Sequence, residues 1–167
     1  MKEKPQTQQM TLDEKIISAK TYLGVAIDFR VKNEIDSSIK FCTKSIDLYS
    51  KNHEVYNTRA ECYVVKFIEG KKINLPNNSD FLKMAKEDAL KALFYNPIDR
   101  EQGKEGFINS TLAQIASLEG DENMFFKYLK DALENGFKVW EYQSQPGFEE
   151  YKSNKKYLDL IAKFKKN

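Results

Sequence analysis

Apolar residues along this 167-residue chain recur every three or four positions, in seven stretches separated by short polar breaks. This spacing places apolar side chains on one face of an α-helix. Sustained alternation of apolar and polar residues, which is typical of strands, is absent. The pattern therefore predicts an all-α protein with helices over about 11–31, 34–49, 54–68, 79–96, 104–119, 121–135 and 154–165. The first helix has apolar positions on more than one stripe, which predicts burial on two sides.

Local signals mark several helix ends. Thr11 and Glu14 have the spacing of a capping box, in which the threonine hydroxyl and the glutamate carboxylate each accept from the other residue's amide. Asn33 suits the left-handed conformation that follows a helix, and Gly136 followed by Phe137 predicts a Schellman end. Capping and turn residues therefore predict these helix boundaries in addition to the periodicity of apolar residues.

Two segments interrupt the helical pattern. Residues 1–10 are polar and are predicted to be disordered. The connection 69–78 is long and polar, and Gly70 and Pro76 predict that no helix continues through it. This connection is either a functional loop on a scaffold or a passive insertion.

A 34-residue period relates the first and third helices. The recurring positions are Tyr22, Val25, Ala26 and Phe29 in 11–31, and Tyr56, Arg59, Ala60 and Tyr63 in 54–68. Small residues separated by four and three positions recur in the second helices, as Ser38, Cys42 and Ser45 and as Ala85, Ala89 and Ala92. A degenerate third copy surrounds Ala113, with Asn109 where an aromatic residue is expected.

This period and this residue frame resemble those of the tetratricopeptide repeat family, over about residues 11–137. The resemblance implies an α-α superhelix of three right-handed helical hairpins, in which the insertion 69–78 lengthens the second repeat. Arg59 departs from the family frame, where leucine is usual, and its side chain must reach a polar partner or solvent. Residues 138–167, with Trp140, Pro146 and Phe148, resemble the capping segment that follows such arrays in many bacterial proteins.

Enzyme signatures are absent from the sequence: it contains no nucleophile elbow, phosphate-binding loop, dinucleotide fingerprint or metalloprotease motif. The single histidine, His53, lies in a polar stretch and is predicted to be a surface turn residue. Cys42 and Cys62 lack metal-ligand spacing and further soft ligands, so they are predicted to be reduced and packed. We therefore predict a non-enzymatic protein with no catalytic residues, metal or cofactor, and an enzyme ranks third among the functions considered.

Charge and hydropathy narrow the choice of partner. The formal net charge is +2, which creates no global field for nucleic acid or membrane. No apolar run approaches membrane-spanning length and no signal-peptide core is present, so we expect a cytoplasmic protein of bacterial type, unless a signal was removed before residue 1. The C-terminal end is locally basic, and the alternative function is a nucleic-acid-associated accessory protein that uses it. Its lysines are Lys152, Lys155, Lys156, Lys163, Lys165 and Lys166.

The first helix of each hairpin lines the concave side of such an array, which is the predicted partner-binding surface. The predicted partner-binding residues are Lys20, Leu23, Ile27 and Arg30; Asn57, Glu61 and Val64; and Phe107, Thr111 and Gln114. This mixture of apolar and polar side chains suits a peptide or protein segment and predicts an interaction scaffold or adaptor. Alternatively, the C-terminal tail or the 69–78 loop covers some of these positions. The oligomeric state is left open.

One partner class within the family is not expected. Members that bind the acidic C-terminal tails of heat-shock chaperones use lysines and asparagines on these helices. The corresponding residues here are Leu23, Ile27, Thr58, Phe107 and Thr111. Because none of them is basic or an asparagine, we do not predict that carboxylate-clamp role.

Overall fold

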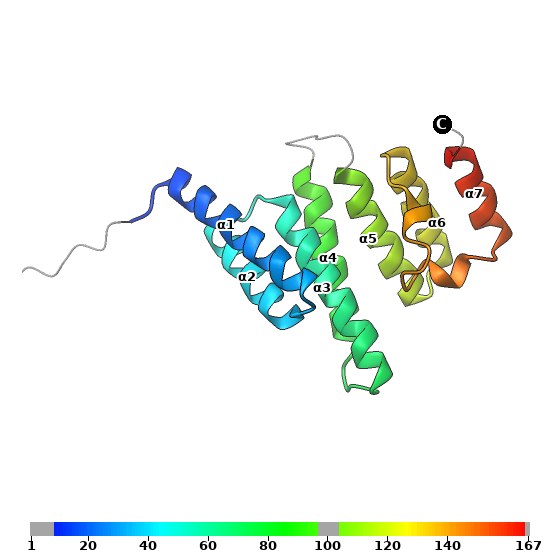
Figure 1. Ribbon diagram of the computed structural model, residues 1–167, viewed down its shortest axis with the longest axis horizontal. Helices are drawn as coiled ribbons and strands as arrows, with labels where there is room; N and C mark the ends of the chain where they lie inside the picture. Colours follow the sequence, from blue (N-terminus) through cyan, green and yellow to red (C-terminus); the bar gives the residue numbers. More distant parts are fainter. Residues whose placement is uncertain (1–8, 97–103, 166–167) are drawn as a thin grey trace, which may run out of the picture.

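The computed structural model describes residues 9–96 and 104–165, and over these ranges the protein is all-α with no strand (Figure 1). The helices are α1 (Leu12–Val31), α2 (Ile35–Leu48), α3 (His53–Lys72), α4 (Ser79–Tyr95), α5 (Lys104–Glu119), α6 (Glu122–Glu134) and α7 (Lys155–Lys165). Two short 3-10 turns, η2 (Val139–Glu141) and η3 (Glu149–Tyr151), lie between α6 and α7. The all-α prediction is confirmed. Most of the predicted disordered segment 1–10 lies outside the described residues.

Consecutive helices pack as three hairpins, α1 with α2, α3 with α4, and α5 with α6 (Figure 1). Contacts between α2 and α3 and between α4 and α5 join neighbouring hairpins into a row. Helix α3 also contacts α1 and α5, so the first helices of the hairpins form a common layer. Helix α7 packs on α6 at the far end of the row.

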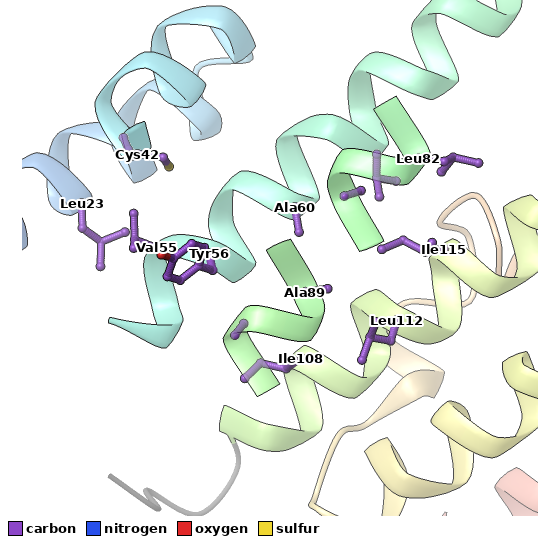
Figure 2. Close-up of a cluster of buried hydrophobic side chains, with 14 residues drawn as sticks. Leu23, Cys42, Val55, Tyr56, Ala60, Leu82, Ala89, Ile108, Leu112 and Ile115 are labelled. Carbon is purple, nitrogen blue, oxygen red and sulfur yellow. The ribbon is translucent and has the colours of Figure 1, made fainter. Parts of the chain in front are cut away.

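Small residues allow the two helices of a hairpin to approach closely. Ala26 and Ala60, the residues that mark the 34-residue period, are both fully buried. Opposite them, the Ser38 hydroxyl donates to the Ala26 carbonyl at 2.8 Å, and the Ser45 hydroxyl donates to a second carbonyl of α1 at 2.7 Å. Figure 2 shows the cluster of buried hydrophobic side chains, with Leu23 and Val55 at one end and Leu112 further along.

The helix ends predicted from local signals at Thr11, Asn33 and Gly136 are confirmed. The Thr11 amide donates to the Glu14 carboxylate at 2.8 Å while the Glu14 amide donates to the Thr11 hydroxyl at 3.3 Å. The hydrogen bonds from Thr11 lower the pKa of Glu14. Asn33 and Gly136 adopt left-handed conformations, with φ of 61° and 84°. The Phe137 amide donates at 2.9 Å to a carbonyl in the last turn of α6, as a Schellman end requires.

The prediction that the helix stops before Gly70 is wrong, because α3 continues through this residue. Gly70 is buried, and a Cβ atom there would lie 2.1 Å from the Oδ1 atom of Asn78. The Asn78 amide instead crosses this space and donates to the Phe67 carbonyl at 2.8 Å. Asn74 and Asn77, with φ of 51° and 56°, then turn the chain into α4. The insertion therefore lengthens the hairpin, whose tip projects beyond its neighbours in Figure 1.

Helix α1 is buried on one side only, so the prediction of two-sided burial is wrong. Ala19, Leu23 and Ala26 face α2 and the core, whereas Ile17 is 66% exposed and Val31 is 77% exposed. The physical reason is position: α1 begins the row, and its outer face has no described helix against it.

Aromatic residues join the C-terminal segment to the last hairpin. The ring of Phe125 stacks on Tyr151 with centroids 3.9 Å apart. Tyr157 and Ile161 bury against the same cluster. Leu158 is 48% exposed, since it follows Tyr157 directly and points about 100° away around α7.

Arg59 reaches the polar partner that its position requires. Its Nε and Nη2 atoms donate to the two carboxylate oxygens of Asp88 on α4, at 2.6 and 2.9 Å. Its Nη1 atom donates to the Thr43 hydroxyl of α2 at 3.0 Å. The Arg59 guanidinium therefore joins the two helices of the second hairpin and also joins this hairpin to the first.

Candidate partner-binding groove

A pocket of about 460 Å³ lies between the first helices of the three hairpins and the C-terminal segment. Six of the ten predicted partner-binding residues line it: Arg30, Glu61, Val64, Phe107, Thr111 and Gln114. They come from α1, α3 and α5, which the hairpin row brings into one layer. We refer to this pocket as the central groove.

The other four predicted residues do not line the central groove. Leu23 is 5% exposed and belongs to the core. Lys20 and Ile27 are exposed on α1 away from the pocket. Asn57 lies one turn before Glu61 and donates to its Oε1 atom at 3.0 Å. Asn57 therefore acts on the groove through Glu61 and does not line it.

An ion pair between two predicted residues forms one wall. The Arg30 Nη1 atom lies 2.5 Å from the Glu61 Oε2 atom and joins α1 to α3. Burial raises the pKa of Glu61 above its ordinary value of 4.5, against the opposing effects of Arg30 and the Asn57 amide. A carboxylate held from both oxygens in this way has a fixed orientation toward the groove.

Aromatic rings form another part of the lining. Phe107 on α5 is 48% exposed, and its ring meets Phe137 edge-on with centroids 5.5 Å apart. Phe137 in turn stacks on Tyr142 at 4.9 Å. Phe148, also a lining residue, is almost fully buried beneath them. The groove is therefore lined by aromatic rings from α5 and the C-terminal segment as well as by the ion pair between α1 and α3.

The C-terminal segment closes the groove at α5. The Gln114 amide donates to the Pro146 carbonyl at 2.5 Å. Gly147 has φ of 92°, and a Cβ atom there would lie 2.8 Å from Gln114 Cγ. Thr111 is 4% exposed, and its hydroxyl donates to the Phe107 carbonyl at 3.1 Å. The alternative that the tail covers part of the predicted surface therefore applies to Gln114.

Sequence reasoning missed several lining residues. Phe137 was assigned to a helix end, and Tyr142 and Pro146 fall in the predicted C-terminal cap. No local signal distinguishes such a residue from one that also faces a groove. Glu69 and Lys72 were assigned to a loop, but they line the groove from the added turns of α3. The insertion therefore contributes to the groove through its helical part.

The two cysteines and the histidine lie outside the central groove. Cys42 and Cys62 are free, fully buried thiols, as predicted, and burial raises the pKa of Cys42 to about 12. His53 is 7% exposed at the start of α3, so its assignment to the surface is wrong. Across 9–96 and 104–165, no three histidine, cysteine or acidic residues are grouped to hold a metal ion. None of the described helices combines the length and apolar character that crossing a membrane requires.

Comparison of the chain with protein-family models, curated proteins and solved structures found no match. The observations that bear on function are therefore the hairpin row, the central groove and the chemistry of the residues that line it.

Proposed function

We propose that this protein is a non-enzymatic scaffold of the tetratricopeptide-repeat type that binds a peptide segment of a partner protein in the central groove. The observation that carries the proposal is the convergence of six predicted residues, from three different helices, on one pocket. The 34-residue period relates the first two of these helices, α1 and α3, and a degenerate third copy relates α5 to them. A repeat array accounts for the period and the convergence together.

The dimensions and chemistry of the central groove support a peptide ligand. A pocket of about 460 Å³ is within the range of specific small-ligand sites and accommodates one or two large side chains. The ring of Phe107 offers an apolar contact, and the Arg30–Glu61 pair offers a fixed donor and acceptor to polar or backbone groups. Glu69 and Lys72 add one charge of each sign at the wall. We expect a segment with an aromatic or large aliphatic anchor and polar neighbours.

The test begins with selection of ligands from a random peptide library displayed on phage, with the wild-type protein as bait. The affinity of an enriched peptide is then measured by fluorescence anisotropy for the Phe107→Ala and Phe94→Ala variants. Phe94 is a matched control, because it is 74% exposed on α4 and does not line the groove. Amide shift changes in the 167-residue protein locate the bound peptide.

Loss of a central aromatic contact typically weakens binding by about tenfold or more, and this is expected for Phe107→Ala. Phe94→Ala is expected to change the affinity by less than about twofold, as for contacts outside an interface core. Shift changes should be confined to the inner faces of α1, α3 and α5 and to 137–148. Enrichment of no peptide, or shift changes on the outer helices α2 and α4, would contradict the proposal.

A further inference from the structure

A second groove, separate from the central groove, lies between α6 and α7 and has a volume of about 710 Å³. Its rim carries five lysines, Lys127 and Lys130 from α6 and Lys155, Lys156 and Lys163 from α7. Asp159 is the one acidic side chain among its described lining residues. Sequence reasoning had placed the basic character in the C-terminal stretch alone. The fold adds Lys127 and Lys130 from α6, which precede Lys152, the first lysine of that stretch, by 25 and 22 positions.

Most of these charges are free to meet a ligand. Lys155 and Lys163 are exposed on α7. Lys130 pairs with Glu134 one turn away at 3.1 Å, but both side chains are about half exposed, and such pairs are weak and easily exchanged. By contrast, Lys152, which the C-terminal stretch also contains, pairs with Glu149 and does not line this groove.

The floor of the groove is apolar. It consists of Phe126 from α6 and Leu160 from α7. Phe126 is 6% exposed, and the Lys156 ammonium lies 3.9 Å from the centre of its ring. An apolar floor beneath a lysine rim, walled by two helices, is complementary to a segment with apolar side chains on one side and carboxylates on the other.

We propose that the α6/α7 groove is a second binding site, which takes an acidic segment of a partner protein with at least one large apolar residue. The carboxylates of this segment pair with the lysine rim, and its apolar residue covers Leu160. This site is independent of the central groove, because the two share no lining residue.

The geometry favours an acidic peptide over nucleic acid. Sequence-tolerant binding of single strands uses aromatic rings on which bases stack, but the one ring in this groove is buried and its face is covered by an ammonium group. The rim contains lysines and no arginine, so it lacks the planar fork that binds phosphate with two parallel hydrogen bonds. Single-stranded DNA is therefore the comparison ligand in the test.

The test uses three fluorescein-labelled probes of matched charge at about 50 mM salt, where charge attraction is strong. The first is a peptide of about twelve residues built from Glu-Glu-Leu units, the second replaces every leucine by glycine, and the third is oligo-dT. They are titrated with the wild type, with Lys155→Glu/Lys163→Glu, and with Lys40→Glu/Lys51→Glu. Lys40 and Lys51 are exposed and lie on or next to α2. Each double variant exchanges two positive charges for two negative ones, which changes the net charge by four, from +2 to −2.

The leucine peptide is expected to bind the wild type at least about fivefold more tightly than the glycine peptide, because leucine burial adds an apolar contribution. Lys155→Glu/Lys163→Glu should weaken its binding about tenfold, and the Lys40→Glu/Lys51→Glu control by less than about twofold. Lys155→Arg/Lys163→Arg should retain binding. Leu160→Ala should remove the preference for leucine over glycine, and circular dichroism checks that each variant stays folded.

Four results would each overturn the proposal. Tighter binding of oligo-dT than of the leucine peptide would assign the groove to nucleic acid. Equal losses in the two double variants would mean that net charge alone governs binding. Equal affinity for the two peptides would remove the role of the floor. Absence of peptide binding at low salt would show that the groove does not bind acidic peptides.

Discussion

The Arg59–Asp88 pair allows a quantitative test of how the array is held together. Asp88→Ala removes the carboxylate and leaves a guanidinium whose side chain is only 15% exposed. Arg59→Leu removes the guanidinium and leaves a carboxylate that is 4% exposed. Each single variant therefore leaves one largely buried charge without its ion-pair partner.

The expected magnitude follows from burial and geometry. Two unit charges about 4 Å apart attract by roughly 4 kcal/mol at the effective dielectric constant of a protein near its surface. Loss of one partner of a buried pair typically costs about 3–5 kcal/mol, and partial exposure of Arg59 places Asp88→Ala near the lower end, at about 3 kcal/mol. Arg59→Leu should cost at least about as much, since Asp88 is the more buried partner. In the double variant both partners are replaced by apolar residues, and its free energy of unfolding should lie within about 1 kcal/mol of that of the wild type.

The assay is urea unfolding followed by circular dichroism, for the wild type, Asp88→Ala, Arg59→Leu and the double variant. For a chain of this size, a loss of about 3 kcal/mol also lowers Tm by about 6–12 °C. Glu134→Ala is the matched control, because it breaks an exposed ion pair with Lys130 and should cost less than about 0.5 kcal/mol.

The double-mutant cycle decides the matter. If the losses of the two single variants simply add in the double variant, the pair is not coupled as its contacts indicate. A loss below about 1 kcal/mol for Asp88→Ala, close to that of the Glu134→Ala control, would equally refute the reasoning, because it would mean that the guanidinium is well solvated without its partner.

Three further predictions concern the grooves and the C-terminal segment. The pKa of Glu61 is raised in the folded state, so just above pH 4.5 the folded protein keeps a proton that the unfolded chain has lost. The free energy of unfolding should therefore fall as pH rises through the folded pKa. Glu61→Gln should flatten this dependence in urea unfolding series measured from pH 4 upward. Among the described residues the buried Tyr157 hydroxyl has no hydrogen-bond partner, so Tyr157→Phe should raise the free energy of unfolding by about 1 kcal/mol. Because burial raises the pKa of Tyr157 to about 12, the same variant should lose less stability between pH 10 and pH 12. Gly147→Ala should destabilise the C-terminal segment by about 1–3 kcal/mol, through left-handed strain and a clash with Gln114, seen as faster hydrogen exchange in 138–151.

Each of these predictions has a control or a contrary result. An unchanged pH dependence in Glu61→Gln would show that another group titrates. Destabilisation by Tyr157→Phe would show that the hydroxyl is hydrogen-bonded in solution. Gly24→Ala is the control for Gly147→Ala, because Gly24 lies within α1 with open space around its Cβ position. It should raise stability by about 0.5–1 kcal/mol through helix propensity.

The sequence predicted the helices closely because the interactions that form and end them are local. The helix predicted at 104–119 is observed as Lys104–Glu119, and the first helix, predicted at 11–31, begins at the capping box of Thr11 and Glu14. The hydrogen bonds that form and cap a helix join residues three or four positions apart, so the local sequence determines them. The one large boundary error, at Gly70, arose because a glycine that usually ends a helix is required here by a side chain eight positions later.

Periodicity also located one face of the central groove, since residues of the three first helices share a register. What it did not contain is the set of contacts between residues distant in sequence. The burial of Glu61 against Arg30, the closure of the groove on Gln114, and the meeting of α6 and α7 lysines each depend on how the hairpins and the C-terminal segment pack. Desolvation and charge proximity are properties of that packing, and they have no counterpart in the order of residues along the chain.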